Sequence, residues 1–259
     1  MDGNKAVHEA FAELAPRYEQ AMDLELGGYL SEGYDEFIDR LLEFAPIQAD
    51  DLVLDVATGT ARIPRELVDR SRARRGIVGL DITPAMLEHA QSSCSVDRYA
   101  EGIHLVCASG TAMAFAAGTF DVVICGFGTH HMDVVDMLSE MRRVLKAGGW
   151  IVVAEAGAPV FWRAWWGRAF LWLSLHLYGL FSGGARAQAE MEAVSNMHTG
   201  DEWHAKLSGA GFTKIEVREE RARRAWYPHA LAIKALAGQS GPGDSNTGVQ
   251  GDQNNVASS

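Results

Sequence analysis

The chain has 259 residues, of which 47% are hydrophobic and 22% charged, a composition that excludes whole-chain disorder and a fibrous repeat protein. Its formal net charge of -11 argues against nonspecific nucleic-acid binding, which depends on Lys and Arg. The 3 cysteines, Cys94, Cys107 and Cys125, are widely separated in apolar stretches, so we expect a reducing compartment and neither a disulfide framework nor a metal site.

The N-terminal region, residues 1–50, contains two segments with apolar side chains at helical spacing, 5–23 and 32–45. Its first residues are polar and charged, unlike a secretory signal. The longest apolar run of the chain, 169–181, is shorter than the about 20 residues that a membrane-spanning helix needs. We therefore expect a soluble, cytoplasmic protein.

From residue 51 onward, short apolar runs alternate with segments of helical pattern. The runs with strand character are 52–56, 76–80, 103–108, 120–125, 150–154, 212–217 and 225–235. The helical segments are 62–72, a helix that opens at Thr83-Pro84, 133–145, which Gly148-Gly149 should stop, and 200–209. This alternation predicts an α/β fold: a doubly wound, mostly parallel, seven-stranded sheet with helices on both faces. Its ligand should lie beyond the carboxyl ends of the strands.

The composition changes sharply at Gly238. Residues 238–259 are dominated by Gly, Ser, Asn, Asp and Gln and offer little apolar surface to bury. Such a segment cannot offset the entropy lost on ordering, so we expect a disordered tail beyond a folded unit that spans 51–237.

The most informative motif follows the first predicted strand, in the sequence VLDVATGTA at 53–61. Asp55 ends an apolar run, Gly59 supplies a turn that other residues would strain, and small side chains allow a ligand to approach the backbone closely. The helix that follows offers unpaired N–H groups at its start. Gly59 can also be read as a purely structural turn between a strand and a helix.

A second acid, Asp81, ends the neighbouring predicted strand, where a carboxylate suits the two hydroxyls of an unphosphorylated ribose. The turn at 57–62 does not match the G-x-G-x-x-G nicotinamide fingerprint. Asp55 would repel a pyrophosphate but would suit a ligand that carries an ammonium group. A nucleoside joined to an amino acid satisfies both acids, which predicts S-adenosylmethionine as the cofactor.

Four segments resemble the successive motifs of class I S-adenosylmethionine-dependent methyltransferases, which have a Rossmann-like fold: VLDVATGTA, VGLDITPAMLEHA, FDVVICGFGTHHM and MRRVLKAGGWIVVAEA. The similarity covers about residues 8–235. AFAELAPRYEQAMD near the N-terminus and the later AGFTKIEV further resemble the ubiquinone/menaquinone C-methyltransferase family. The resemblance implies an N-terminal region, 1–50, that covers the cofactor site, and a methyltransferase domain at 51–237.

The resemblance also implies a role for individual positions. Asp55, Ala57 and Gly59 would line the methionine part of the cofactor, and Asp81 would hold the ribose with Ile82 against the adenine. Ser109, Gly110 and Thr111 are expected at the adenine amino group. Tyr18 would cover the cofactor, and Gly126 would lie beside the sulfonium.

Two positions depart from the family pattern. Ser109 replaces the usual Asp, so its contact with the adenine should be weaker. Ala61 replaces the usual last Gly of the turn, which is tolerable if its φ is negative.

Three residues are candidates for the general base. His130 and His131 follow the fourth predicted strand, where the methyl group should point, and we marginally prefer His131. Glu155 ends the fifth strand and is the other candidate. The alternative is structural for all three: histidines that pack or bond the backbone, and a glutamate that bonds loop N–H groups. Asp133 should cap the helix that follows it.

An aromatic insertion is expected at 158–198. Its central part, 159–181, contains the tryptophans Trp162, Trp165, Trp166 and Trp172, out of 7 in the chain, and Arg but no acid. Trp and Arg among aliphatic residues are typical of interfacial helices at anionic membranes. A lid that lines an apolar acceptor pocket is the second interpretation of this segment. A packed helical cap is the third interpretation.

These features predict methyl transfer to carbon or oxygen of a small hydrophobic acceptor that is aromatic or prenylated and quinol-like. Lid and membrane interpretations of 159–181 both favour such an acceptor, and the latter adds peripheral membrane contact. A small-molecule O- or N-methyltransferase of secondary metabolism is the alternative within enzymes. A noncatalytic cofactor-binding module and a cyclase on the same scaffold are alternatives of another class, because fold alone does not define function.

Overall fold

The computed structural model describes residues 11–30, 33–167, 171, 194 and 196–238. The expected tail at 238–259 lies outside the described residues except for Gly238. Most of the aromatic insertion, including Trp172, also lies outside them.

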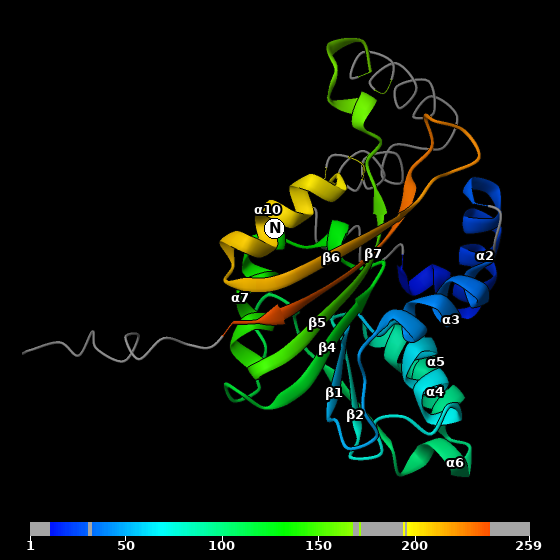
Figure 1. Ribbon diagram of the computed structural model, residues 1–259. Helices are drawn as coiled ribbons and strands as arrows, with labels where there is room; N and C mark the ends of the chain where they lie inside the picture. Colours follow the sequence, from blue (N-terminus) through cyan, green and yellow to red (C-terminus); the bar gives the residue numbers. More distant parts are fainter. Residues whose placement is uncertain (1–10, 31–32, 168–170, 172–193, 195, 239–259) are drawn as a thin grey trace, which may run out of the picture.

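The described chain forms a 7-stranded sheet with the order β3-β2-β1-β4-β5-β7-β6 (Figure 1). Its strands are β1 (Val53–Val56), β2 (Ile77–Asp81), β3 (Ile103–Cys107), β4 (Phe120–Gly126), β5 (Leu145–Gly157), β6 (Phe212–Glu220) and β7 (His229–Ala237). The first five strands are mutually parallel, and β7 runs antiparallel to both of its neighbours. The predicted doubly wound, mostly parallel seven-stranded sheet is thereby confirmed.

Helices cover both faces of this sheet, as predicted (Figure 1). The α-helices are α2 (Tyr18–Tyr29), α3 (Tyr34–Phe44), α4 (Arg62–Asp69), α5 (Pro84–Cys94), α6 (Asp97–Ala100), α7 (Val134–Val144) and α10 (Gly200–Gly209). Short 3-10 helices are η1 (Ala15–Arg17), η2 (Thr129–His131) and η3 (Val160–Arg163). Helices α7 and α10 lie on one face of the sheet, and α2 to α5 lie on the other.

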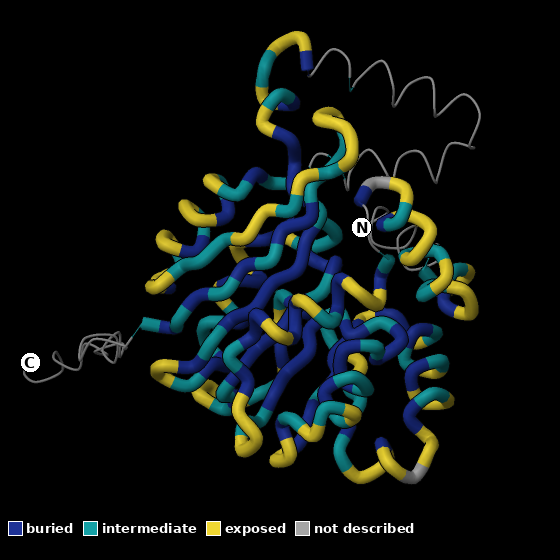
Figure 2. The backbone as a smooth tube through the Cα atoms, turned by 45° about the vertical axis from the view of Figure 1, so that its right-hand side comes forward, coloured by how far each residue is buried: buried dark blue, intermediate teal, exposed yellow. Residues whose placement is uncertain are grey.

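Two apolar layers pack the helices against the two faces of the sheet. The side chains of β4 alternate between these layers. Val123 and Cys125 pack with α7 and α10, whereas Val122 and Ile124 pack with α3 and α4. Because side chains alternate between faces, a strand buried on both sides reads as a continuous apolar run. The central strands of the sheet are consequently the most buried part of the molecule (Figure 2).

Several element boundaries differ from the predicted ones. Helix α7 ends at Val144 and β5 begins directly at Leu145, so Gly148-Gly149 lies within the irregular start of a strand and does not stop the helix. Leu145 pairs with Phe120 and Trp150 pairs with Val122, which leaves the intervening residues looped out. At the C-terminal end, β7 spans 229–237 and not 225–235, because residues 221–228 form the connection to β6.

The first predicted helix, 5–23, is interrupted within its described part. Pro16 lies in η1, and α2 starts only at Tyr18 and continues to Tyr29. A proline has no N–H to donate and restricts its neighbour, so a helical segment changes geometry there. The break gives α2 an N-terminal residue, Tyr18, at the carboxyl edge of the sheet.

Candidate functional site

Strand β1 carries, just before the turn that follows it, a buried carboxylate with one oxygen that has no hydrogen-bond partner. Asp55 is 1% exposed, and its Oδ2 accepts a hydrogen bond of 2.7 Å from Thr58 Oγ1. Its Oδ1 is buried and has no hydrogen-bond partner. Burial raises the pKa of Asp55 to about 7, against the Thr58 hydrogen bond, which lowers it, and with Asp81, which raises it further. An unpaired buried carboxylate oxygen fits a ligand that brings a positive charge.

The same turn contains three residues in the left-handed region. Ala57, Gly59 and Ala61 have φ values of 57°, 54° and 59°. The expectation that Ala61 would tolerate its place through a negative φ is wrong, because its N–H bonds Thr58 O at 2.9 Å and fixes the tight turn. Left-handed backbone costs roughly 1–2 kcal/mol for a residue with a Cβ, so this turn holds local strain.

Replacing Ala61 with glycine should stabilise the protein by about 0.5–1 kcal/mol, because glycine adopts a positive φ without steric cost but loses more chain entropy on folding. Ala90 is the matched control, since both residues are 0% exposed and Ala90 lies inside helix α5. Ala90→Gly should destabilise by about 1 kcal/mol. Urea unfolding of both variants measures the difference, and equal destabilisation would show that the turn is unstrained.

The second acid lies against this turn. Asp81, at the end of β2, accepts hydrogen bonds from Gly59 N at 2.9 Å and from Thr83 N at 2.8 Å. The side chain is 7% exposed, while the following Ile82 is 39% exposed. The two predicted acids thus meet at one turn, across the pairing of β1 with β2.

Helix α2 closes over the turn. A Cβ placed on Gly59 would lie 3.9 Å from Tyr18 Cε1, so the Tyr18 ring borders the glycine. Glu19 holds the helix there, because its Oε1 accepts from Thr60 Oγ1 at 2.8 Å and pairs with Arg65. Burial, followed by the charges of Asp81 and other acids, raises the pKa of Tyr18 well above its usual value. Tyr18 therefore stays protonated and able to donate a hydrogen bond.

The predicted adenine-side residues form a compact turn after β3. Ser109 Oγ accepts from Thr111 N at 3.2 Å and lies 2.9 Å from Thr111 Oγ1. Gly110 is closely packed, since a Cβ there would lie 2.8 Å from Met132 Sδ and 2.9 Å from Val56 Cγ1. Only a residue without a side chain fits between β1 and the loop after β4.

The end of β4 and the loop that follows it lie against α4 and the turn after β1. A Cβ on Gly126 would lie 2.8 Å from Ile63 Cδ1, and one on Gly128 would lie 2.5 Å from the Cβ of Ala57. Between them, Phe127 has a φ of 54°. Sequence reasoning selected Gly126 but missed Gly128, although the CGFG segment contains two glycines around a strand end.

A buried hydrogen-bonded cluster lies where β4 and β5 end. Glu155 is 1% exposed; its Oε1 lies 2.7 Å from His130 Nδ1 and accepts from Ala156 N at 2.7 Å. Thr129 Oγ1 donates to Glu155 Oε2. Asn196 Nδ2 donates to His130 O at 3.1 Å. Sequence reasoning missed Thr129 and Asn196, which have no motif of their own.

His131 has a different environment from its neighbour. Its ring packs edge-on against Phe11 at 4.9 Å and lies 4.0 Å from the His130 ring. Burial, and then the charge of His130, lowers the pKa of His131 to about 3. A histidine with such a pKa is a weak base, whereas His130 is oriented by a carboxylate, a difference that favours His130 as the candidate base.

The described part of the aromatic insertion divides into a packed and an exposed portion. Trp162 is 5% exposed, and Arg163 forms an ion pair of 2.6 Å with Glu202 of α10. Trp165 and Trp166 are 82% and 53% exposed.

Asp133 caps α7 as predicted, because its side chain accepts hydrogen bonds from Val135 N and Asp136 N.

A pocket of about 290 Å³ lies between the end of β5, the start of α10 and β7, and none of the predicted site residues lines it. No group of His, Cys, Asp or Glu among the described residues is arranged to hold a metal ion. Within the same residues, no helix has the length and apolar character needed to cross a bilayer.

The model of the ubiE/COQ5 methyltransferase family matches residues 2–172, which include both acids, the glycine turn and the His130–Glu155 cluster. The chain belongs to the ubiE/COQ5 methyltransferase family. A relative from Geobacter sp. strain M21, a ubiquinone/menaquinone biosynthesis C-methyltransferase, is 31% identical over 216 residues, covering 81% of this chain and 88% of its own.

Solved structures support the same fold for this family member. The [4+2]-cyclase SpnF aligns with a TM-score of 0.67 at 14% identity, over 90% of this chain and 96% of its own. Geranyl diphosphate C-methyltransferase from Streptomyces coelicolor, solved with S-adenosyl-L-homocysteine, aligns with a TM-score of 0.61 at 13% identity, over 78% of each chain. These two likenesses concern the fold alone.

As a member of the ubiE/COQ5 methyltransferase family, the protein is an S-adenosylmethionine-dependent methyltransferase. The residues present fit this cofactor. The buried Oδ1 of Asp55, which has no hydrogen-bond partner, suits an ammonium group.

Proposed function

We propose that the protein methylates a ring carbon or a hydroxyl of an apolar, quinol-like acceptor, with His130 as the general base. The observation that carries the proposal is the pair of half-buried His130 with buried Glu155 at the carboxyl edge of the sheet, next to the turn that joins the two acids. The acceptor class is supported by the family and by relatives that are named for ubiquinone and menaquinone biosynthesis.

The cofactor would be held from several sides of the turn. Asp55, Ala57 and Gly59 would bind its methionine part, with Asp55 ionised opposite the ammonium. Asp81 would exchange its bond to Gly59 N for the ribose hydroxyls. The remaining contacts proposed are Ile82, Ser109, Gly110 and Thr111 around the adenine, Gly126 beside the sulfonium, and Tyr18 as a cover.

The chemistry of the chain's own residues follows from the cluster. Bound S-adenosylmethionine supplies an electrophilic methyl group on a sulfonium. Glu155 accepts a hydrogen bond from His130 Nδ1, which orients the ring so that a proton is taken up at Nε2. His130 would accept the hydroxyl proton of a phenolic acceptor, which raises electron density on the oxygen and on the ring carbons beside and opposite it.

Two parts of the chain would exclude water from this site. The N-terminal region 1–50 would cover the cofactor, as the contacts of Tyr18 and Glu19 with the turn support. The insertion at 158–198 would border the acceptor, since its residue Asn196 bonds the His130 carbonyl. A dry site favours transfer because the charged reactants are surrounded by fixed dipoles in place of water.

Asp81→Ala should weaken the binding of S-adenosylhomocysteine by roughly 10- to 100-fold, because the loss of a charge-assisted hydrogen bond costs about 1.5–3 kcal/mol. Titration calorimetry measures the dissociation constant. Asp50→Ala is the matched control, as Asp50 is an exposed acid outside the turn. An Asp81→Ala protein that is folded and binds normally would refute the ribose assignment.

Turnover of methyl-labelled S-adenosylmethionine with a panel of acceptors tests the function itself. Demethylated quinols should be methylated at least tenfold faster than small phenols or catechols, and the labelled product identifies the atom. Faster turnover of the small phenols would favour the alternative, a small-molecule O-methyltransferase. Cofactor binding without turnover of any acceptor would contradict the proposal.

A further inference from the structure

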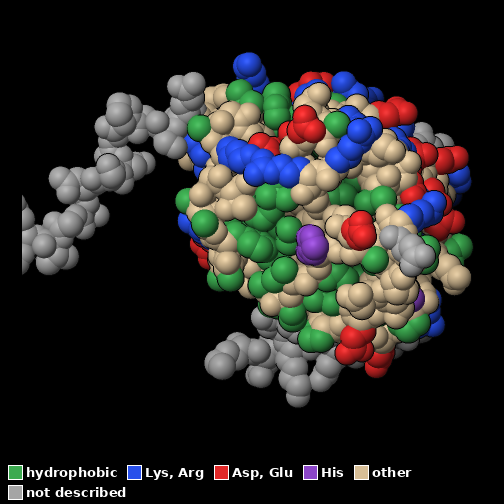
Figure 3. Space-filling view, turned by 90° about the horizontal axis from the view of Figure 1, so that it is seen from below, with side chains coloured by type: hydrophobic (Ala, Val, Ile, Leu, Met, Phe, Trp, Pro, Cys, Tyr) green, Lys and Arg blue, Asp and Glu red, His purple; other side chains and the backbone are tan. Residues whose placement is uncertain are grey.

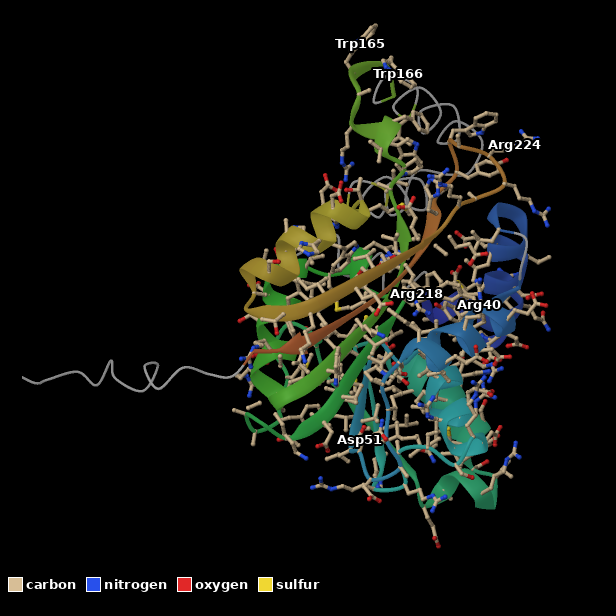
Figure 4. All side chains as sticks on the ribbon, viewed as in Figure 1. Arg40, Asp51, Trp165, Trp166, Arg218 and Arg224 are labelled. Carbon is tan, nitrogen blue, oxygen red and sulfur yellow. The ribbon has the colours of Figure 1, made fainter. Side chains whose placement is uncertain are left out.

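Two segments bring exposed side chains to one end of the sheet: 158–167, after β5, and 221–228, between β6 and β7. Because β5 and β6 both run antiparallel to β7, their carboxyl ends lie at the same end of the molecule as the start of β7. Trp165, Trp166 and Arg224 are seen at this end in Figure 4. The candidate site opens at the same edge, since Glu155 lies near the end of β5.

The apolar part of this end projects into solvent. The side chains that are exposed there are Val160 at 74%, Trp165 at 82%, Trp166 at 53% and Trp226 at 46%. Trp166 is stacked on Phe161, with ring centroids 5.4 Å apart and planes at 17°. This stacking holds the Trp166 ring in its exposed position. Exposed aromatic side chains in a group mark a surface for interaction.

The cationic part consists of Arg221, Arg223 and Arg224, all exposed. In the described part of the chain, none of the three belongs to an ion pair, whereas Arg163 nearby is neutralised by Glu202. Arg224 lies over the ring of Trp226, 5.4 Å from its centroid. On a chain of net charge -11, this is a local reversal of sign. The opposite end, in contrast, mixes both signs of charge (Figure 3).

We propose that this surface docks on an anionic lipid bilayer. The aromatic–arginine surface consists of Val160, Trp165, Trp166, Arg221, Arg223, Arg224 and Trp226. Tryptophan rings settle at headgroup level, and arginine pairs with lipid phosphate. An acidic protein would match the arginines but would leave two projecting tryptophans in water, so charge and shape together favour the bilayer. The purpose rests on the proposed function, because a prenylated acceptor resides in lipid.

Vesicle co-sedimentation tests the surface. The full chain should bind vesicles of phosphatidylcholine with about one third phosphatidylglycerol and should bind pure phosphatidylcholine far more weakly. Arg221→Ala/Arg223→Ala/Arg224→Ala should lower the partition coefficient roughly 100-fold, since each cation near an anionic surface contributes a factor of about five. Trp165→Ala/Trp166→Ala should lower it at least tenfold.

The control is Arg75→Ala/Val96→Ala, which removes an exposed arginine and an exposed apolar side chain before β2 and after α5, away from this surface. It should bind vesicles as the unchanged chain does. Equal losses in control and test variants, or no preference for anionic lipid, would overturn the proposal; so would absence of vesicle binding, the outcome expected of a surface for an acidic protein.

Turnover separates this inference from the proposed function. The arginine variant should methylate a short-chain, water-soluble quinol normally and should lose activity only toward a prenylated quinol in anionic vesicles. Normal vesicle binding without turnover of either quinol would contradict the proposed function and leave the docking surface supported. Normal turnover of the vesicle-embedded quinol by the arginine variant would overturn the docking surface alone.

Discussion

Asp55→Asn should abolish measurable cofactor binding while making the cofactor-free protein more stable. The carboxylate is buried and one of its oxygens has no partner, so its charge is unfavourable until a positive group arrives. An amide of the same shape removes that charge but cannot pair with an ammonium. Breaking a buried ion pair from one side costs about 3–5 kcal/mol, which corresponds to a binding loss of more than 100-fold.

The stability effect depends on pH in a defined direction. The pKa of Asp55 is raised from 3.8 to about 7, so the folded state resists ionisation that the unfolded chain permits. The free energy of unfolding is therefore unaffected by the Asp55 charge below pH 4. It falls as the pH rises toward 7, by about 1.4 kcal/mol per pH unit within this window. Asp55→Asn should remove the fall, a gain on the order of 2–4 kcal/mol at pH 8.

Chemical unfolding at pH 4 and pH 8, without and with S-adenosylhomocysteine, measures both effects. The unchanged protein should gain stability from the ligand at pH 8, and Asp55→Asn should not. Thr58→Val, which keeps the carboxylate but removes its hydrogen bond, should raise the pKa further and extend the fall in stability to higher pH. A variant that is destabilised at pH 8 and still binds would contradict this view of the turn.

The second large effect is expected on the chemical step. His130→Ala should lower kcat for a quinol by roughly 10²–10⁴-fold with cofactor affinity unchanged, the usual contribution of a general base. Glu155→Gln should lower kcat less, because the carboxylate acts only through the orientation of the His130 ring. Single-turnover rates at saturating cofactor isolate this step.

His131 provides the internal control for this assignment. Its pKa of about 3 predicts that His131→Asn retains most of the activity, since a base this weak contributes little at neutral pH. His104→Ala, on the exposed side of β3, controls for the loss of any histidine. If His131→Asn lowered kcat more than His130→Ala did, His131 would be the general base.

The strand–helix order, the sheet and the meeting of Asp55 with Asp81 could all be predicted from local pattern. Buried parallel strands read as apolar runs, and an acid at the end of such a run has to emerge at the carboxyl edge. Asp133 as a helix cap followed from the same local logic. These features depend on residues close together in sequence, which is why a single chain reveals them.

Features that depend on tertiary contact could not be predicted. His130 and His131 are adjacent in the chain, and only the fold shows that Glu155 engages the first and not the second. Ala61 takes a positive φ because its neighbours impose a turn that its own propensity disfavours. The arginines at 221–224 gain meaning only when the antiparallel β7 brings them to the end where Trp165 projects.

The position of β7 has a consequence for how the protein is made. This strand pairs with β5 on one side and β6 on the other, yet it follows both in the chain. Until residues 229–237 have left the ribosome, β5 exposes an open edge and β6 has no hydrogen-bonded neighbour, a state in which unpaired edges invite aggregation. The nascent chain therefore completes its sheet by a late insertion, and premature termination before this strand would yield a product that chaperones and proteases recognise as unfinished.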